Sequence, residues 1–223
     1  MTLEITLLAL ESILLVATVI LLIYSIREGR HRDNLLVEIG KTAKILTRQE
    51  YFLTVVDTMM EAENEVVGCI TGRQPVGDDI KRTREVVATI ERLVSKGVRV
   101  KYLLPRFPDR LHVGYLYTKA GAEVRYSSCL MVHNIRFMIA DERVVVIGIP
   151  DVVGEKEATK KGHRIPSEGL AIVLKNYFST CEKQTSYADY VKEVLKQTGA
   201  SPQHLARELH IDEEEFRKIA DNR

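Results

Sequence analysis

The sequence has few of the residues that crosslink small proteins or give them an extreme charge. It contains no tryptophan and three cysteines, and its 32 Lys and Arg nearly balance 31 Asp and Glu, for a net charge of +1. Cys69, Cys129 and Cys181 are odd in number and widely spaced, which argues against a disulfide framework and a zinc site and fits a reducing compartment. The charge balance gives no indication of nucleic-acid binding.

Three signatures of cofactor binding are also missing from the sequence: a cluster of metal ligands, a P-loop and a glycine-rich dinucleotide motif. We therefore expect neither a metal nor a cofactor. The 223 residues suffice for one well-buried domain with an accessory segment, and are too few for two ordinary domains joined by a linker.

One long apolar run lies near the N-terminus. Residues 5–26, ITLLALESILLVATVILLIYSI, are mostly Leu, Ile, Val and Ala. A helix of about 22 residues is roughly 33 Å long, which is enough to cross the core of a bilayer. A cleaved signal peptide would need a basic start, but residues 1–4 carry no positive charge. We therefore expect residues 1–26 to be an uncleaved, single-pass transmembrane anchor.

The charges around this run predict its orientation. Glu4 precedes the run, whereas Arg27, Arg30 and Arg32 follow it directly. The positive-inside rule then places the N-terminus outside the cell and the rest of the chain in the cytoplasm, in agreement with free cysteines. Glu11 lies within the run, where it either reaches the membrane interface or contributes to helix packing.

Residues 27–48 are expected to form a basic juxtamembrane helix. Apolar residues over 33–65 recur at spacings of four and three, as in a heptad seam. Two interpretations of residues 34–48 stay open. They form either a short parallel coiled coil that pairs two chains, or an amphipathic connector on the lipid surface, where basic residues are worth about 1 kcal/mol each.

Helix-like and strand-like segments alternate over residues 49–198. We expect helices at 49–63, from Asp78 or Asp79 to 96, at 109–120 and up to about 197, and strands at 65–72, 98–105, 122–128 and 169–175, with a hairpin at 134–149. Because long helices separate most strands, the pattern predicts an α/β fold: a mostly parallel sheet with helices on both faces and one antiparallel hairpin.

Residues 199–223 are predicted to be a helical tail of two short helices. Ser201 and Pro202 form a cap and first-turn pair, and the second helix begins near Asp212. The arrangement has the outline of a helix-turn-helix, but its second helix opens with the acidic residues 212–215, which suit DNA poorly. We expect a packing or partner-binding appendage and no nucleic acid.

The hairpin, in VHNIRFMIADERVVVIGIPD (residues 132–151), carries the clearest chemical signal. Together with the order of elements over 49–198, it resembles one half of the phospholipase D fold, whose enzymes carry H-x-K-x4-D-x6-G-S-x-N on such a strand pair. In that family the His is the nucleophile, the Lys binds phosphate, and two copies meet across a twofold axis. The resemblance therefore implies this fold and a homodimer.

The motif frame is kept only in part. With Asp141 in the place of the motif's Asp, Arg136 takes the place of the Lys and Gly148 that of the Gly. The Ser and Asn that follow the Gly are replaced by Ile149 and Asp151.

The nucleophile is replaced as well. Asn134 occupies its place, and an amide forms no phospho-enzyme intermediate because its nitrogen lone pair is delocalised. The adjacent His133 would point to the opposite face of a strand unless a bulge turned it round. The pattern thus argues against catalysis. The resemblance extends to family members without the His, the effector-sensing domains of archaeal sugar-responsive transcription regulators, which implies ligand sensing or scaffolding.

An anion site is predicted where ligands bind α/β sheets, beyond the carboxyl ends of the strands. The candidate ligand-binding residues are Thr71, Gly72, Arg73, Arg106, Asn134, Arg136 and Asp141. Arginines beside an amide and free backbone N–H groups suit a phosphate, a carboxylate or a sugar phosphate. The alternatives are that the arginines are solvated, or that Arg136 pairs with an acid such as Asp141 or Asp151.

Three functions are compatible with the sequence. We prefer a membrane-anchored, cytoplasmic, non-catalytic phospholipase D-like domain that dimerises and binds a small anionic ligand or a partner protein. The second is a phosphodiesterase or nuclease that uses His133, and the third is a structural or assembly subunit of a membrane complex. A soluble transcription regulator is disfavoured, because the sequence has an anchor where such a protein has its DNA-binding domain.

Overall fold

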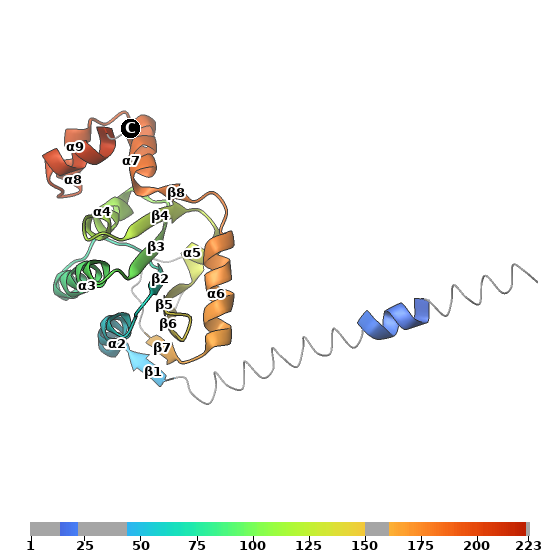
Figure 1. Cartoon of the computed structure of the whole chain (residues 1–223). Coiled ribbons are helices and arrows are strands. Elements are labelled where there is room, and N and C mark those ends of the chain that lie inside the picture. The colour runs from blue at the N-terminus through green and yellow to red at the C-terminus, as the bar shows by residue number, and fades with distance from the viewer. Residues whose placement is uncertain (1–13, 22–43, 150–160, 222–223) are drawn as a thin grey trace, which may run out of the picture. The chain divides into compact units, whose positions relative to one another are not determined.

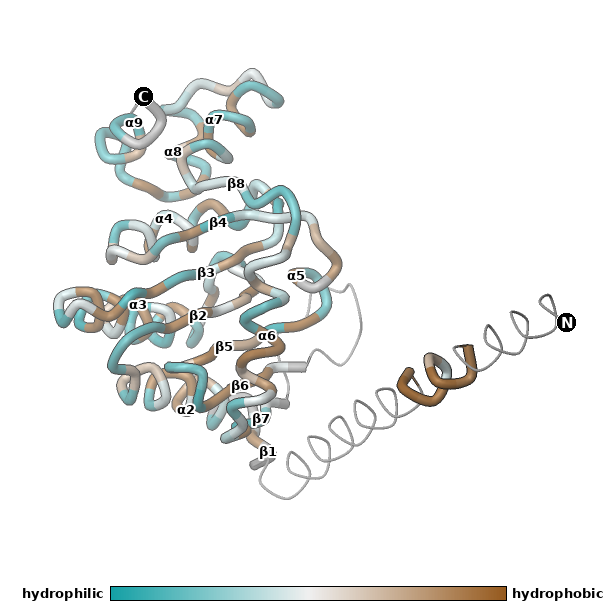
Figure 2. The backbone as a smooth tube through the Cα atoms, turned by 45° about the vertical axis from the view of Figure 1, so that its right-hand side comes forward, coloured by the Kyte–Doolittle hydropathy of each residue, from teal (hydrophilic) through white to brown (hydrophobic). Residues whose placement is uncertain are grey.

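The computed structural model describes residues 14–21, 44–149 and 161–221. The chain divides into two compact units, residues 1–42 and 43–223. In the first unit, residues 14–21 are helical and hydrophobic (Figure 2). Within the described ranges, no helix is both long and apolar enough to cross a membrane. Most of the predicted anchor and residues 27–43 of the predicted juxtamembrane helix lie outside the described residues.

In the second unit, the described strands form one eight-stranded sheet in the order β1-β7-β6-β5-β2-β3-β4-β8 (Figure 1). The strands are β1 (Lys44–Thr47), β2 (Glu65–Cys69), β3 (Arg99–Pro105), β4 (Glu123–Ser127), β5 (Arg136–Ala140), β6 (Val144–Ile149), β7 (Lys161–Ile165) and β8 (Thr185–Ser186). Parallel pairing joins β2 to β3 and β3 to β4, whereas the other neighbours pair antiparallel. The prediction of a mostly parallel sheet was wrong, because the β5–β6 hairpin pairs antiparallel with β2 and β7 on its two sides, and β1 and β8 also pair antiparallel with their neighbours.

Helices cover both faces of this sheet (Figure 1). The described helices of this unit are α2 (Arg48–Met60), α3 (Asp78–Ser95), α4 (Leu111–Lys119), α5 (Leu130–Asn134), α6 (Glu168–Thr180), α7 (Tyr187–Thr198), α8 (Pro202–Glu208) and α9 (Glu213–Asp221), with a 3₁₀ turn η1 (Pro108–Arg110). Side chains of α2, α3, α4 and α7 pack in one core cluster, and those of α6 pack in the other. The α/β character and the two covered faces were therefore predicted correctly.

Strand β5 shows how the sheet divides these two cores. Met138 and Ala140 belong to the cluster on the α2 and α3 side, whereas Phe137 and Ile139 belong to the cluster on the α6 side. Successive side chains of a strand point to opposite faces. All five residues of β5 are buried, so the hairpin lies in the middle of the fold and Arg136, its first residue, is held by packed neighbours.

The sheet begins earlier than the predicted boundary at residue 49. Residues 44–47, predicted to be helical, form β1, which pairs with β7, and Leu46 is fully buried there. Thr47 ends the strand as the N-cap of α2 in a capping box with Glu50, whose carboxylate accepts a hydrogen bond from Thr47 N at 2.9 Å. The T-x-x-E spacing was the signal that helix α2 starts after Thr47.

The segment 169–175, predicted to be a strand, belongs to helix α6. Ser167 caps this helix by accepting a hydrogen bond from Leu170 N at 3.3 Å. The buried residues Ala171, Leu174 and Phe178 recur with helical spacing along its inner face. A short apolar run does not distinguish a buried strand from a buried helix by periodicity, which explains the error.

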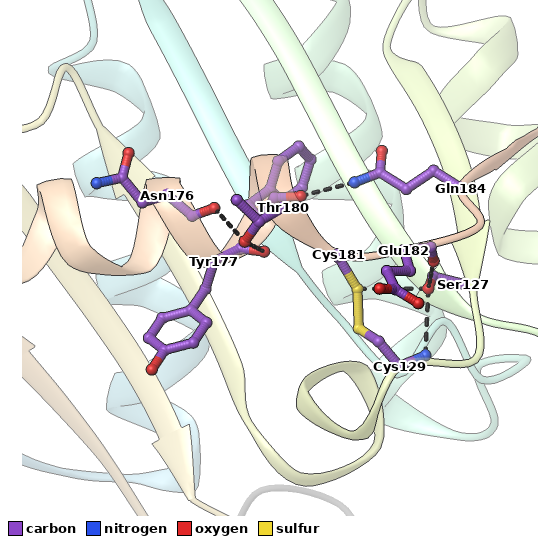
Figure 3. The surroundings of a disulfide bond; sticks show 9 residues. Ser127, Cys129, Asn176, Tyr177, Thr180, Cys181, Glu182 and Gln184 are labelled. Carbon is purple, nitrogen blue, oxygen red and sulfur yellow. Dashed lines mark hydrogen bonds between the residues drawn. A yellow bond between two sulfur atoms is a disulfide. The ribbon is translucent and has the colours of Figure 1, made fainter.

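Cys129 and Cys181 form a disulfide, with Cα atoms 6.1 Å apart across 52 residues of sequence (Figure 3). Cys69 is free and buried. The bond joins the chain after β4 to the end of α6, and the buried hydroxyl of Ser127 donates to Glu182 O and accepts from Cys129 N beside it. The expectation of three free cysteines was wrong, because the topology brings together two residues that lie far apart in sequence.

The tail packs on the α/β domain. Phe216 of α9 is fully buried, and the Glu215 carboxylate accepts hydrogen bonds from the Tyr115 hydroxyl and from Lys119 Nζ, both on α4. Ser201 caps α8 as predicted, and Asp212 caps α9, which begins near the predicted residue; each side chain accepts a hydrogen bond from the backbone amide three residues later. The tail therefore packs on the domain, and the alternative of partner binding stays a prediction.

Candidate anion-binding cavity

A cavity of about 560 Å³ opens at the carboxyl end of β2. Its lining comes from α2, α3, α4, the chain that follows β2, strand β3 and the start of β5. The charged residues in this lining are Arg73, Arg136 and Asp79. Cavities of this size, largely apolar with a few polar groups, are typical of small-molecule sites. The cavity lies where the sequence predicted a crevice, beyond the ends of the parallel strands.

Arg136 lies deepest among the charged groups of the cavity. It is 9% exposed and, as the first residue of β5, lies on the same face of the strand as Met138. Burial lowers the pKa of the guanidinium, and the positive charge of Arg73 lowers it further. The nearby Tyr51 phenol opposes this shift, and burial raises the pKa of Tyr51 itself to about 12. Arg136 is thus a cation at a position where burial disfavours its positive charge.

Arg110, which the sequence did not single out, adds a third cation. It ends η1, is 9% exposed, and its guanidinium carbon lies 5.7 Å from the centroid of the Phe107 ring. Burial lowers its pKa; the Asp109 carboxylate, 3.0 Å from Nη1, opposes this, and Arg73 and Arg136 lower the pKa further. Its Nε has no hydrogen-bond partner in the described part of the chain. We call Arg73, Arg110 and Arg136 the arginine cluster.

Gly72 brings the chain into this cluster. Its φ of +62° is one that L side chains rarely adopt, and a Cβ there would lie 2.3 Å from Leu104 Cδ2. Thr71, Gly72 and Arg73 all line the cavity together with Arg136. These four candidate residues are therefore brought together, from two strands that are neighbours in the sheet.

Arg106 lies outside the cavity lining. Its guanidinium pairs with the Glu193 carboxylate and lies 5.2 Å from the centroid of the Tyr190 ring, both on α7. The side chain thus fastens α7 to the end of β3. The sequence alone could not show which of Arg106 and Arg110 lies near the cavity, because both residues follow β3 and are only four residues apart.

Asp141 lies at the opposite end of β5, in the turn to β6. Its carboxylate accepts hydrogen bonds from the backbone N of Glu63 at 2.7 Å and of Asn64 and Glu65 at 2.8 Å. Burial alone would raise the pKa of Asp141, but these amides and Arg143 lower it below its ordinary value. With about 3.3 Å per residue, the five-residue strand places Asp141 roughly 15 Å from Arg136.

Asn134 and His133 belong to helix α5, which ends immediately before β5. The alternation of side chains along a strand therefore does not apply to them. The His133 ring packs against Phe107, with ring centroids 5.4 Å apart and planes at 69°. Neither residue lines the cavity that contains Arg136.

Across 14–21, 44–149 and 161–221, no three His, Cys, Asp or Glu side chains lie close enough together to hold a metal ion. The cations of the cavity lining, Arg73 and Arg136, suit recognition of a negative charge.

Comparison with known proteins supports the fold. No family model matches the sequence, and no curated protein matches it. NucT from Helicobacter pylori aligns with a TM-score of 0.50 at 14% identity, over 65% of this chain and 98% of its own.

Two further solved structures align less closely. Nuc from Salmonella typhimurium, a phospholipase D family member, gives a TM-score of 0.49 at 15% identity over 66% of this chain and 97% of its own. TrmBL2, an archaeal chromatin protein, gives 0.44 at 16% identity over 69% of this chain. This match spans 60% of the TrmBL2 chain, less than two thirds of its length. At these identities the likeness concerns the fold alone, and the chain shares the fold of NucT.

Proposed function

We propose that the chain is a membrane-anchored phospholipase D-like domain without phosphodiesterase activity, which senses a small anionic ligand or scaffolds a partner as a homodimer. The observation that carries the proposal is Arg136. It stands in the strand position of the motif's phosphate-binding Lys, is nine-tenths buried, and lines a cavity of about 560 Å³ with Arg73. An anion in this cavity would compensate charges that burial disfavours.

The arrangement of the arginines supports anion binding rather than a purely structural role. Like charges raise each other's free energy, and burial removes the water that would screen them. Arg110 and Arg136 both have pKa values lowered by burial and by the charge of Arg73. Guanidinium groups bind phosphate and carboxylate oxygens with two parallel hydrogen bonds, so an anion is the partner that this cluster suits best.

The surroundings of the motif positions support the absence of catalysis. A phosphodiesterase of this type needs an imidazole at the phosphate, but Asn134 stands in the nucleophile's place at the end of α5. The one adjacent imidazole, that of His133, packs against the Phe107 ring. A reaction would require His133 to leave this contact and enter the cavity.

The membrane anchor and its orientation rest on the sequence. Residues 5–26 are long and apolar enough to span a bilayer, and the three arginines that follow favour a cytoplasmic domain. The Cys129–Cys181 disulfide weighs against a reducing compartment. Protease added to intact cells decides between the two: a protected domain supports the cytoplasmic side, and a degraded one places it outside.

The proposal is tested with the full-length chain in lipid nanodiscs. We expect inorganic phosphate to bind, Arg136→Gln to weaken binding by about 10- to 100-fold, as for loss of a charged hydrogen bond, and Arg106→Gln to leave it unchanged. Hydrolysis of bis(p-nitrophenyl) phosphate should stay at the level of the nanodiscs alone. Hydrolysis that disappears in His133→Ala would overturn the non-catalytic reading, and phosphate binding unaffected by Arg136→Gln would overturn the site.

A further inference from the structure

The wall of the cavity away from the arginine cluster is apolar. Val86 of α3, Val113 of α4 and Met138 of β5 line it, and each is at most 5% exposed, so the floor of the cavity is the hydrophobic core itself. Phe52 and Val55 of α2 complete this wall on the outer side. An anion bound at Arg136 would leave most of this apolar surface without a partner unless the ligand itself covered it.

Aromatic rings continue this wall towards the sheet. Tyr102 and Tyr117 line the cavity with their rings 4.8 Å apart. The Tyr102 hydroxyl donates to Met59 Sδ at 3.6 Å within the core, so this residue offers the cavity its ring rather than its hydroxyl. Both phenols have raised pKa values because they are buried, which keeps them neutral. The part of the cavity lined by Tyr102 and Tyr117 is thus uncharged.

Most polar groups of the lining come from the chain that follows β2 and from the start of α3, where Thr83 is the last of them. Thr71, Arg73 and Gln74 follow β2, and Asp79 begins α3, where it lies 3.6 Å from Arg82. A sugar needs several carboxylate or amide side chains distributed around its hydroxyl groups, because each buried hydroxyl without a hydrogen bond is costly. The Val, Met and Phe wall provides none.

We infer that the ligand of this cavity is an amphiphilic anion: one phosphate or carboxylate head at Arg136 and Arg73, joined to an apolar body that fills the space between α2, α3 and α4. This inference rests on the proposed function and names the class of its ligand. Inorganic phosphate and sugar phosphates would occupy the head position and leave the apolar wall uncovered. Burial of each CH₂ group increases affinity about fourfold, so the body would dominate the binding.

A chain-length series tests the inference. The full-length chain in nanodiscs of zwitterionic lipid is titrated with ethyl, butyl and hexyl phosphate, with glucose 6-phosphate, and with empty nanodiscs as the control for partition into lipid. We expect affinity to rise up to about fourfold per CH₂ until the cavity is full, and glucose 6-phosphate to bind no better than ethyl phosphate.

Cavity-filling variants show where the alkyl chain binds. Val55→Phe narrows the cavity at a half-buried position and should abolish the dependence on chain length while ethyl phosphate still binds. Val173→Phe is the matched control, because Val173 is exposed on α6, away from the cavity. Retained binding of ethyl phosphate shows that each variant is folded.

The outcomes separate this inference from the proposed function. If all phosphates bind with equal affinity and Arg136→Gln weakens them all, the anion site stands and the amphiphile is wrong. If no phosphate binds, the proposed function fails as well. Repeating the series with an anionic phospholipid in the nanodisc identifies the source: weaker apparent binding of hexyl phosphate there indicates that a membrane lipid occupies the cavity, and unchanged binding indicates a free ligand.

Discussion

The two edges of the sheet at the ends of β5 balance buried charge to different degrees. At the edge where β5 ends, Glu65 is 6% exposed, and its carboxylate lies 2.6 Å from Lys175 Nζ and 3.0 Å from Lys101 Nζ. At the edge where β5 begins, Arg110 and Arg136 are buried, burial lowers the pKa of both, and Arg73 lowers it further. We call these the paired edge and the cationic edge.

The difference indicates what each edge is for. Opposite charges that meet with good geometry fasten the hairpin to β2 and α6, and removal of one member leaves the other uncompensated. Cations gathered in one place oppose folding, and such arrangements are concentrated at functional sites. The cationic edge is instead held covalently, because Cys129 follows β4 at this edge and is bonded to Cys181. Charge pairs hold the paired edge, whereas the cationic edge carries the proposed ligand site.

The largest expected effect comes from breaking the covalent link of the cationic edge. A disulfide that closes a loop with a sequence separation of 52 stabilises a fold by roughly 4 kcal/mol in the chain-entropy treatment. The double variant Cys129→Ser/Cys181→Ser should lower the free energy of unfolding by about this amount, measured by denaturant titration. Phosphate binding should weaken too, since α5 leads directly into Arg136.

Treatment of the wild type with dithiothreitol is the matched control and should reproduce the destabilisation of the double variant. Alkylation without reductant should modify neither Cys129 nor Cys181 in the purified chain. If alkylation modified both Cys129 and Cys181, and the double variant were as stable as the wild type, then charge pairs rather than a disulfide would hold the cationic edge.

The next effect concerns the turn at the paired edge. Asp141→Ala removes a carboxylate that accepts hydrogen bonds from the backbone amides of Glu63, Asn64 and Glu65, and leaves alanine at a φ of +49°. We expect a loss of about 3 kcal/mol in the free energy of unfolding. Glu91→Gln, at an exposed position of α3, should change it by less than about 0.5 kcal/mol. Equal effects of the two substitutions would refute the structural role of Asp141.

The paired edge also predicts a dependence on pH. The folded state lowers the pKa of Asp141 through the amides and Arg143, and that of Glu65 through Lys175 and Lys101, although burial opposes both shifts. A carboxyl group whose pKa is lowered in the folded state stabilises the fold at pH values above its ordinary pKa. This stabilisation is lost as the pH falls through the pKa of the folded state. Stability should therefore fall below about pH 4–5, and less steeply in Asp141→Ala.

Much of this comparison could be predicted from the sequence, but not all of it. The spacing of the motif along the hairpin predicted that Arg136 lies at a cavity and that Asp141 belongs to the same pair of strands. This prediction was possible because the spacing of residues along two joined strands is fixed. The same frame could not show that β5 separates Arg136 from Asp141 by its whole length, nor that Asn134 and His133 end a helix. Contacts between residues distant in sequence, such as Cys129 with Cys181, depend on topology that one sequence does not contain.

A matched pair of substitutions compares the two edges directly. Lys175→Met removes a cation that lies 2.6 Å from Glu65 and 2.5 Å from Glu142, and should cost roughly 1–2 kcal/mol because the pair is partly exposed. Arg110→Met removes a cation from the arginine cluster and should leave stability unchanged or raise it by up to about 1 kcal/mol. Denaturant titration of both variants measures the change in the free energy of unfolding, which should differ in sign between them. Destabilisation by both would mean that the cationic edge is structural as well.

The smallest expected effect defines where the arginine cluster ends. Arg106 is at the same edge as Arg110, but it pairs with Glu193 and lies over the Tyr190 ring. Because this pair is partly exposed, Arg106→Gln should destabilise the fold by about 0.5–1 kcal/mol and leave the binding of alkyl phosphates unchanged. The sign thus differs from that of Arg110→Met, although the two residues are four apart. If Arg106→Gln weakened ligand binding as Arg136→Gln does, the proposed ligand site would include Arg106 as well.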